Sequence, residues 1–147
     1  MIQRLRPSEV RLLMLRECDL LRAALEVLTA RSEREPEELR AGIVDLRDRL
    51  RNYLRKEQEL LLPALEQTDH HGPGRLASMR AAHATHFFAA EELARAAVKP
   101  ESDPRELAAR LCDLRFDLCR DLDEDERCLL IAEVLQDHAY GQDQTDG

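Results

Sequence analysis

The sequence predicts an all-α domain, built as an up-down-up-down four-helix bundle. Three observations lead to this prediction: the composition, four amphipathic segments and an internal repeat. The 147-residue chain has only 3% aromatic residues and no Trp, and it is rich in Leu, Ala, Arg and Glu. Such residues favour helices packed by aliphatic side chains and are poor material for sheets. Because the chain has the length of one ordinary domain, we predict a single bundle over residues 1–136 and a polar C-terminal tail over 137–147.

Apolar residues recur at helical spacing in four segments. Three of these segments begin beside a Pro and acidic residues, which favour the first turn of a helix. The predicted helices span residues 8–31, 37–67, 75–98 and 104–136. The sequence TDHHGPG at 68–74 interrupts the helical pattern and marks the midpoint turn.

The second and fourth predicted helices resemble each other. With an offset of 68 residues, positions 39–65 and 107–133 share 10 identities in 27 aligned positions. The first and third helices align more weakly with an offset of 65, which places Cys18 opposite His83. We interpret the repeat as a duplicated helical hairpin, which gives the bundle a pseudo-twofold axis.

Charge and hydropathy argue against two classes of partner. The net charge is −8, and the 22 basic residues are scattered among 30 acidic ones, so no basic stripe is offered to a nucleic acid. No apolar run approaches the roughly 20 residues of a membrane span, and residues 1–7 lack the apolar core of a signal peptide. We expect a cytoplasmic protein without nucleic-acid or membrane partners. Its four cysteines lack CxxC spacing and are expected to be reduced.

Each apolar stripe is interrupted by polar side chains at a similar depth. These side chains are all of types that bind metals, and we take them as candidate ligands: Cys18, Tyr53, Glu57, His83, His86, Asp121 and Asp125. The pairs Tyr53/Glu57 and Asp121/Asp125 have i, i+4 spacing, so both members of each pair share one helix face.

The three carboxylates on these stripes need a neutralising partner. Each costs several kcal/mol in an apolar core unless it is paired, and no Lys or Arg lies on the stripes. The alternatives are bound protons, His83 and His86 as cations, arginines reaching in from the flanks, or a metal ion. A metal would use the Cys, Tyr, His and carboxylate side chains together.

Four local sequences resemble motifs of the hemerythrin-like, or HHE cation-binding, family. YLRKEQELLLPAL, which contains Tyr53 and Glu57, is similar to the second-helix motif H-L-x-x-E-E-x-x-L-hydrophobic-P. ECDLLRAALEVL is similar to the first-helix motif E-H-x-x-L-R, with Cys18 at the histidine, and RAAHATHFF places His83 at the third-helix histidine. DLDEDERCLL is similar to the fourth-helix motif H-L-x-x-E-E-R-x-L-L, with Asp121 at its histidine and Asp125 at the bridging carboxylate.

The resemblance implies a metal centre used in small-molecule redox chemistry. Glu57 and Asp125 would bridge the metals, with terminal ligands at Cys18, Tyr53, His83 and Asp121 and with His86 as a reserve ligand. Whether His86 or Glu124 replaces one of the proposed ligands stays open. The implied cofactor is iron, either as one ion or as a di-iron pair. Zinc and no metal are the alternatives. The implied partners are dioxygen, peroxide or nitric oxide, in handling or in sensing.

The chain departs from the family at three of the four matched histidines, which are Cys18, Tyr53 and Asp121 here. An alternative is therefore a metal-free hemerythrin fold that serves as an interaction or regulatory module. No nucleophile and base are spaced as in a hydrolase, and whether the protein is an enzyme stays open, as do its protein partners and its oligomeric state.

Overall fold

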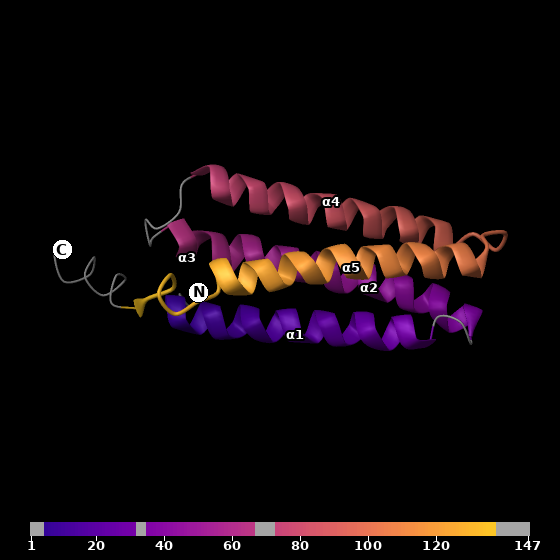
Figure 1. Ribbon diagram of the computed structural model, residues 1–147, viewed down its shortest axis with the longest axis horizontal. Helices are drawn as coiled ribbons and strands as arrows, with labels where there is room; N and C mark the ends of the chain where they lie inside the picture. Colours follow the sequence, from indigo (N-terminus) through magenta and orange to yellow (C-terminus); the bar gives the residue numbers. More distant parts are fainter. Residues whose placement is uncertain (1–4, 32–34, 67–72, 138–147) are drawn as a thin grey trace.

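A computed structural model describes residues 5–31, 35–66 and 73–137 of the chain. Its helices are α1 (Pro7–Arg31), α2 (Pro36–Lys56), the π-helix η1 (Glu57–Leu61), α3 (Leu62–Glu66), α4 (Pro73–Ala97) and α5 (Pro104–Cys128). Because α2, η1 and α3 follow one another without a break, the described residues form four long helical segments and no strand. Figure 1 shows these segments side by side along the long axis. The all-α prediction is confirmed for this part of the chain.

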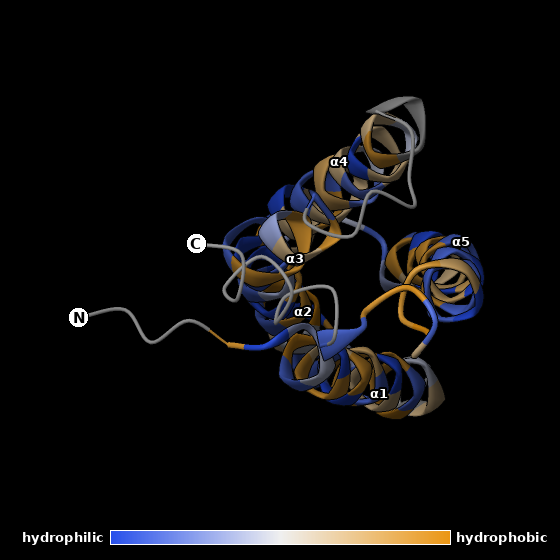
Figure 2. Ribbon diagram, turned by 90° about the vertical axis from the view of Figure 1, so that its left-hand side faces the viewer, coloured by the Kyte–Doolittle hydropathy of each residue, from blue (hydrophilic) through white to orange (hydrophobic). Residues whose placement is uncertain are grey.

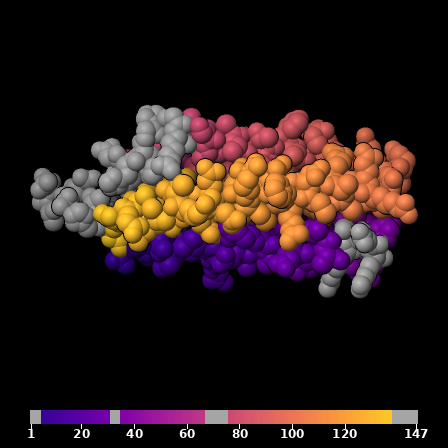
Figure 3. All heavy atoms as spheres, viewed as in Figure 1, coloured from indigo at the N-terminus to yellow at the C-terminus, as the bar shows by residue number. Residues whose placement is uncertain are grey.

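Each long segment packs mainly against two neighbours. Helix α2 packs against α1 and α4, α5 packs against α4 and α1, and α2 and α5 also touch each other. The end-on view places α1 and α4 at opposite corners (Figure 2), and the space-filling view shows α5 and α1 side by side along one face (Figure 3). The predicted apolar stripes face the interior, where Met14, Leu25, Leu50 and Leu111 are almost completely buried. No described helix combines the length and the apolarity that a membrane span requires.

The second helical segment contains a π-turn where the sequence predicted uninterrupted α-helix. The backbone N–H of Leu62 donates to the carbonyl of Glu57, five residues earlier. Pro63 supplies a physical reason, since its ring would clash with the carbonyl of Glu59 in a regular α-helix. The wider turn moves the apolar stripe by one position, so that Leu61 is buried, whereas Leu60 is only partly buried. Residue 67, the predicted end of this helix, lies outside the described residues.

The last helix is shorter than predicted. It ends at Cys128 rather than at residue 136, and the N–H groups of Leu129 and Leu130 both donate to the carbonyl of Asp125. Leu129, Leu130, Val134 and Leu135 are all buried. Continued as a helix they would spread over about 240° of its surface, so burying all four requires the chain to turn.

The segment after α5 is tied to the start of α1. The backbone N–H of Ser8 donates to Asp137 Oδ1 at 2.8 Å, and the Ser8 hydroxyl donates to Oδ2 at 2.5 Å. Asp137, predicted to belong to a polar tail, is therefore bound to the domain, whereas 138–147 lie outside the described residues.

Arg40 of α2 joins that helix to the turn between α4 and α5. Its guanidinium donates to the carbonyl oxygens of Ala97, Lys99 and Ser102 and to the Ser102 hydroxyl, at 2.6–2.9 Å. The contact with Ala97 gives a partner to a carbonyl group at the end of α4, and the others hold the turn that follows.

The predicted starts of the other helices agree with the structure to within two residues. Helix α4 begins at Pro73, inside the stretch 68–74 that was predicted to be a turn, and the rest of that stretch lies outside the described residues. On α5 the buried stripe follows Leu118, Leu122 and Asp125.

Candidate functional site

The imidazole of His83 lies between two carboxylates in the interior. His83 Nε2 is 2.7 Å from Asp125 Oδ2 of α5, and its Nδ1 contacts Glu57 Oε2 of η1. The side chains of Glu57 and His83 are only 2% and 3% exposed, and that of Asp125 is 12% exposed. No described Lys or Arg forms an ion pair with either carboxylate. If both carboxylates are ionised and His83 is protonated, the three side chains carry a net charge of −1.

The contact between Glu57 and His83 joins two buried atoms. Glu57 Oε2 and His83 Nδ1 form an ion pair with each other, and neither has another partner among the described residues. Glu57 is also the first residue of the π-turn, a feature that is frequent at functional sites.

His83 is held in its charged form. Burial lowers its pKa, but the hydrogen bond to Asp125 and the contact with Glu57 outweigh that effect and raise the pKa to about 10. A proton on His83 therefore neutralises one of the two buried carboxylates at neutral pH.

Cys18 and Tyr53 form a second, neutral pair. Cys18 Sγ of α1 and Tyr53 Oη of α2 are 3.5 Å apart, and both side chains are buried. Burial raises the pKa of the Cys18 thiol to about 12 and raises the pKa of Tyr53 well above its ordinary value. Both groups therefore keep their protons at neutral pH, and either would have to lose one to become an anionic metal ligand.

His86 and Asp121 form a third pair, between α4 and α5. His86 Nε2 contacts Asp121 Oδ2, and the two side chains are 11% and 18% exposed. This pair lies nearer the surface than the group around His83. It also borders a cavity of about 390 Å³ between the two helices, which is lined in part by His86, Thr85 and Asp117.

The seven candidate ligands thus meet in three groups. The edge-to-face contact of the Tyr53 and His83 rings, with centroids 6.1 Å apart, joins the first two groups. Within the described ranges, no three His, Cys, Asp or Glu side chains are arranged to hold one metal ion together. The reason is visible at His83, which presents opposite ring edges to Glu57 and Asp125. For these carboxylates to share an ion, the imidazole would have to move from between them. Glu124, the alternative ligand, is exposed.

One arginine near these groups was not identified from the sequence. Arg22 of α1 contacts Asp123 Oδ1 at 2.7 Å and Glu126 Oε1 at 2.6 Å, which joins α1 to α5. Arg22 lies one helical turn after Cys18, and the acidic run at 123–126 is the sequence signal that would have paired it.

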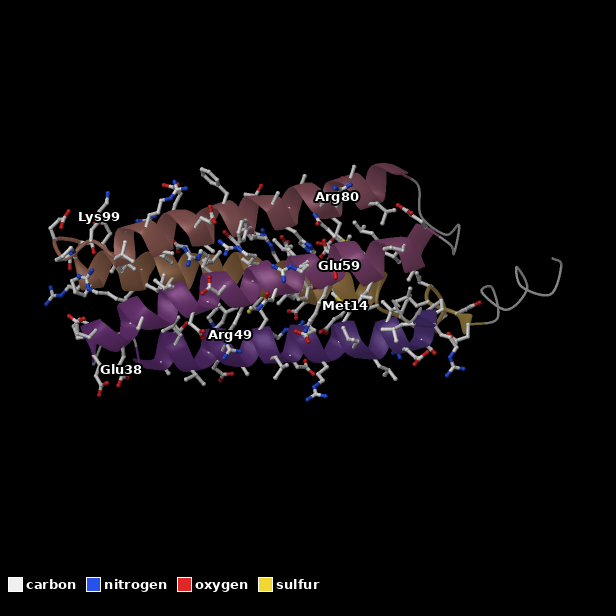
Figure 4. The ribbon with its side chains drawn as sticks, turned by 180° about the vertical axis from the view of Figure 1, so that it is seen from behind. Met14, Glu38, Arg49, Glu59, Arg80 and Lys99 are labelled. Atoms are coloured by element: carbon white, nitrogen blue, oxygen red, sulfur yellow. The ribbon has the colours of Figure 1, made fainter. Side chains whose placement is uncertain are left out.

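A cavity of about 390 Å³ between α2, η1 and α4 reaches the central group. Its lining includes Glu57 and His83 themselves, together with Arg80, Ala81 and Ala84. Figure 4 shows Arg80 on α4 and Glu59 on the neighbouring η1 segment. The cavity gives small molecules a route to the buried contact between Glu57 and His83.

Comparison with models of known families, with curated proteins and with solved structures gave no match. The similarity to hemerythrin-like motifs therefore rests on the sequence motifs alone and stays a prediction.

Proposed function

We propose that this chain is a metal-binding, up-down-up-down four-helix bundle made from a duplicated helical hairpin, similar in design to hemerythrin-like proteins. Its centre would be built on Glu57, His83 and Asp125, and its role would be the handling or sensing of small redox molecules. The proposed cofactor is iron, and the cytoplasmic location stays part of the proposal.

The observation that supports this most strongly is the pair of buried carboxylates, Glu57 and Asp125, which face the single imidazole of His83 and form no ion pair with a described Lys or Arg. Carboxylate oxygens and an imidazole nitrogen are suitable iron ligands. A cation bound here in place of the His83 proton would offset the net negative charge of the central group. The chemistry of the donors therefore fits a metal, although a shared ion needs a rearrangement of His83.

The surrounding residues have distinct roles in this proposal. Glu57 and Asp125 supply negative charge, and His83 supplies a ring nitrogen once its proton is released. Cys18 and Tyr53 stay protonated and orient the His83 ring through the contact of Tyr53. When bound, iron would supply a Lewis acid and a one-electron redox couple.

Competition between a proton and a metal at His83 gives the test. Ferrous iron or zinc titrated into chelator-treated protein should bind more tightly at pH 8 than at pH 6, with release of protons. Glu57→Gln should abolish this binding, since it removes a charge without changing the shape of the side chain. Glu59→Gln is the matched control, because Glu59 lies in the same π-turn and is exposed. Equal binding by the two variants would contradict the proposed site.

A metal-free interaction or regulatory module is the second candidate. The observation that favours it is that His83 already contacts both buried carboxylates, so a proton can take the place of a metal. In that case neither iron nor zinc would bind at any pH, and Glu57→Gln would change stability only.

A further inference from the structure

The outer face of α5 carries a basic hollow beside an exposed aromatic ring. Phe116 supplies the ring and is 69% exposed. At 100° per residue it lies about 160° around the helix from the buried Leu118, so this face points away from the core. The hollow has a volume of about 560 Å³, and three arginines line it: Arg115, Arg120 and Arg127.

The three guanidinium groups have no close carboxylate partner in the described part of the chain. Arg115 forms no ion pair there, and Arg120 is 3.8 Å from Asp117 Oδ1. Arg127 donates from Nε to the backbone carbonyl of Asp123 at 3.4 Å. The Asp123 carboxylate also lines the hollow, but an arginine of α1 already pairs with it at 2.7 Å. The hollow is therefore positively charged, although the whole chain has a net charge of −8.

We propose that this face binds an acidic segment of a partner protein. An apolar side chain of that segment would pack on Phe116, and its carboxylates would pair with the three arginines. Arginine and aromatic residues are enriched in protein interfaces and dominate their binding energy. A guanidinium group also pairs with a carboxylate through two parallel hydrogen bonds, which gives the contact a direction. The interface does not depend on the proposed metal centre.

The spread of the positive charges favours a peptide segment over a small anion. Arg115 and Arg127 are about 18 Å apart along the helix axis, at about 1.5 Å per residue. A single carboxylate or phosphate is too small to contact groups spread over this length, whereas an extended segment of about six residues covers it. Three cations on a chain of net charge −8 are too few to favour a nucleic acid.

Fluorescence anisotropy of a labelled acidic peptide tests the proposal. The probe is a short peptide of glutamates around one central phenylalanine, and the same peptide with glutamines is the neutral reference. The acidic peptide should bind with a dissociation constant on the order of 10–100 µM that rises with salt, because exposed ion pairs are weak and screened. The neutral peptide should bind at least about tenfold more weakly.

Two double variants with the same loss of charge locate the site. Arg115→Gln/Arg120→Gln should weaken binding of the acidic peptide at least about fivefold, and Phe116→Ala should also weaken it. The matched control is Arg49→Gln/Arg95→Gln, because these arginines are exposed on α2 and α4 and pair with carboxylates there. It should bind the peptide as the wild type does. Circular dichroism should show unchanged helical content in all variants, since each of these side chains is at least partly exposed.

An exposed native thiol gives a second readout. Cys112 lines the hollow, whereas Cys128 does not. Saturating acidic peptide should slow the alkylation of Cys112 by iodoacetamide and leave that of Cys128 unchanged, as measured by mass spectrometry.

Four results would each overturn the proposal: no saturable binding, equal binding of the neutral peptide, equal weakening by the control double variant, or no protection of Cys112. A polynucleotide that binds more tightly than the peptide at physiological salt would assign the face to a nucleic acid instead. Self-association of the chain that Phe116→Ala abolishes would assign it to a second copy.

Discussion

Raising the pH should destabilise the metal-free protein through His83, before any other group with a shifted pKa contributes. The pKa of His83 is raised to about 10 in the folded chain, whereas an unfolded histidine has a pKa of about 6.5. The folded state therefore keeps a proton that the unfolded state loses. The stability that this proton contributes to the folded state is fully present below pH 6.5 and is lost as the pH rises towards 10.

The size of the effect follows from that difference. Each pH unit between these two pKa values costs about 1.4 kcal/mol, so the free energy of unfolding should fall by about 2–3 kcal/mol from pH 6.5 to 8.5. In urea this corresponds to a midpoint lower by about 1 M. The pH range stops at 8.5 because Cys18 contributes a second loss of stability at higher pH. Burial raises the pKa of its thiol from 9.0 to about 12, so above pH 9.0 the unfolded chain loses a proton that the folded chain keeps.

Urea unfolding followed by circular dichroism, with chelator present, measures this change. The double variant Glu57→Gln/Asp125→Asn removes both carboxylate charges from His83 and should abolish or reverse the loss, since burial alone lowers the pKa of His83. A free energy that is constant between the two pH values in the wild type, or an NMR titration showing a neutral His83 imidazole at pH 8.5, would refute the reasoning.

Three further predictions concern the fold. Arg40→Ala should lower the free energy of unfolding by about 2–3 kcal/mol, measured in urea, because it removes the four hydrogen bonds that join α2 to the turn between α4 and α5. Leu122→Ala should cost about 3 kcal/mol in the same assay, since Leu122 is fully buried, whereas Phe116→Ala should cost less than about 0.5 kcal/mol. Asp137→Asn should cost at most about 1 kcal/mol near neutral pH. The hydrogen bonds from Ser8 lower the pKa of Asp137, so the wild-type advantage over this variant should disappear as acid titrates that carboxylate.

Helical periodicity predicted the long segments well, because burial of one face dominates their stability. It failed where a different constraint acts. Pro63 widens the preceding turn, which helical periodicity cannot predict, and the four buried apolar residues after Cys128 have no single-face pattern. Their burial depends on the end of the domain, which is formed by residues distant in sequence.

The candidate site was predictable only in part. Glu57, His83 and Asp125 were identified because polar residues on apolar stripes are costly and therefore conspicuous. The pairs that these residues form could not be predicted, since the pairs depend on how the helices are placed around one another. The sequence grouped Asp121 with Asp125 by spacing, yet in the structure Asp121 pairs with His86 and Asp125 pairs with His83.

The metal content of the protein tests the central claim most directly. Elemental analysis of chain purified from cells grown with added iron should give at least about one metal ion per chain for the wild type and for Glu59→Gln. Glu57→Gln should give almost none. A wild-type chain that contains no metal, and that binds neither iron nor zinc when they are added at pH 8, would contradict the account.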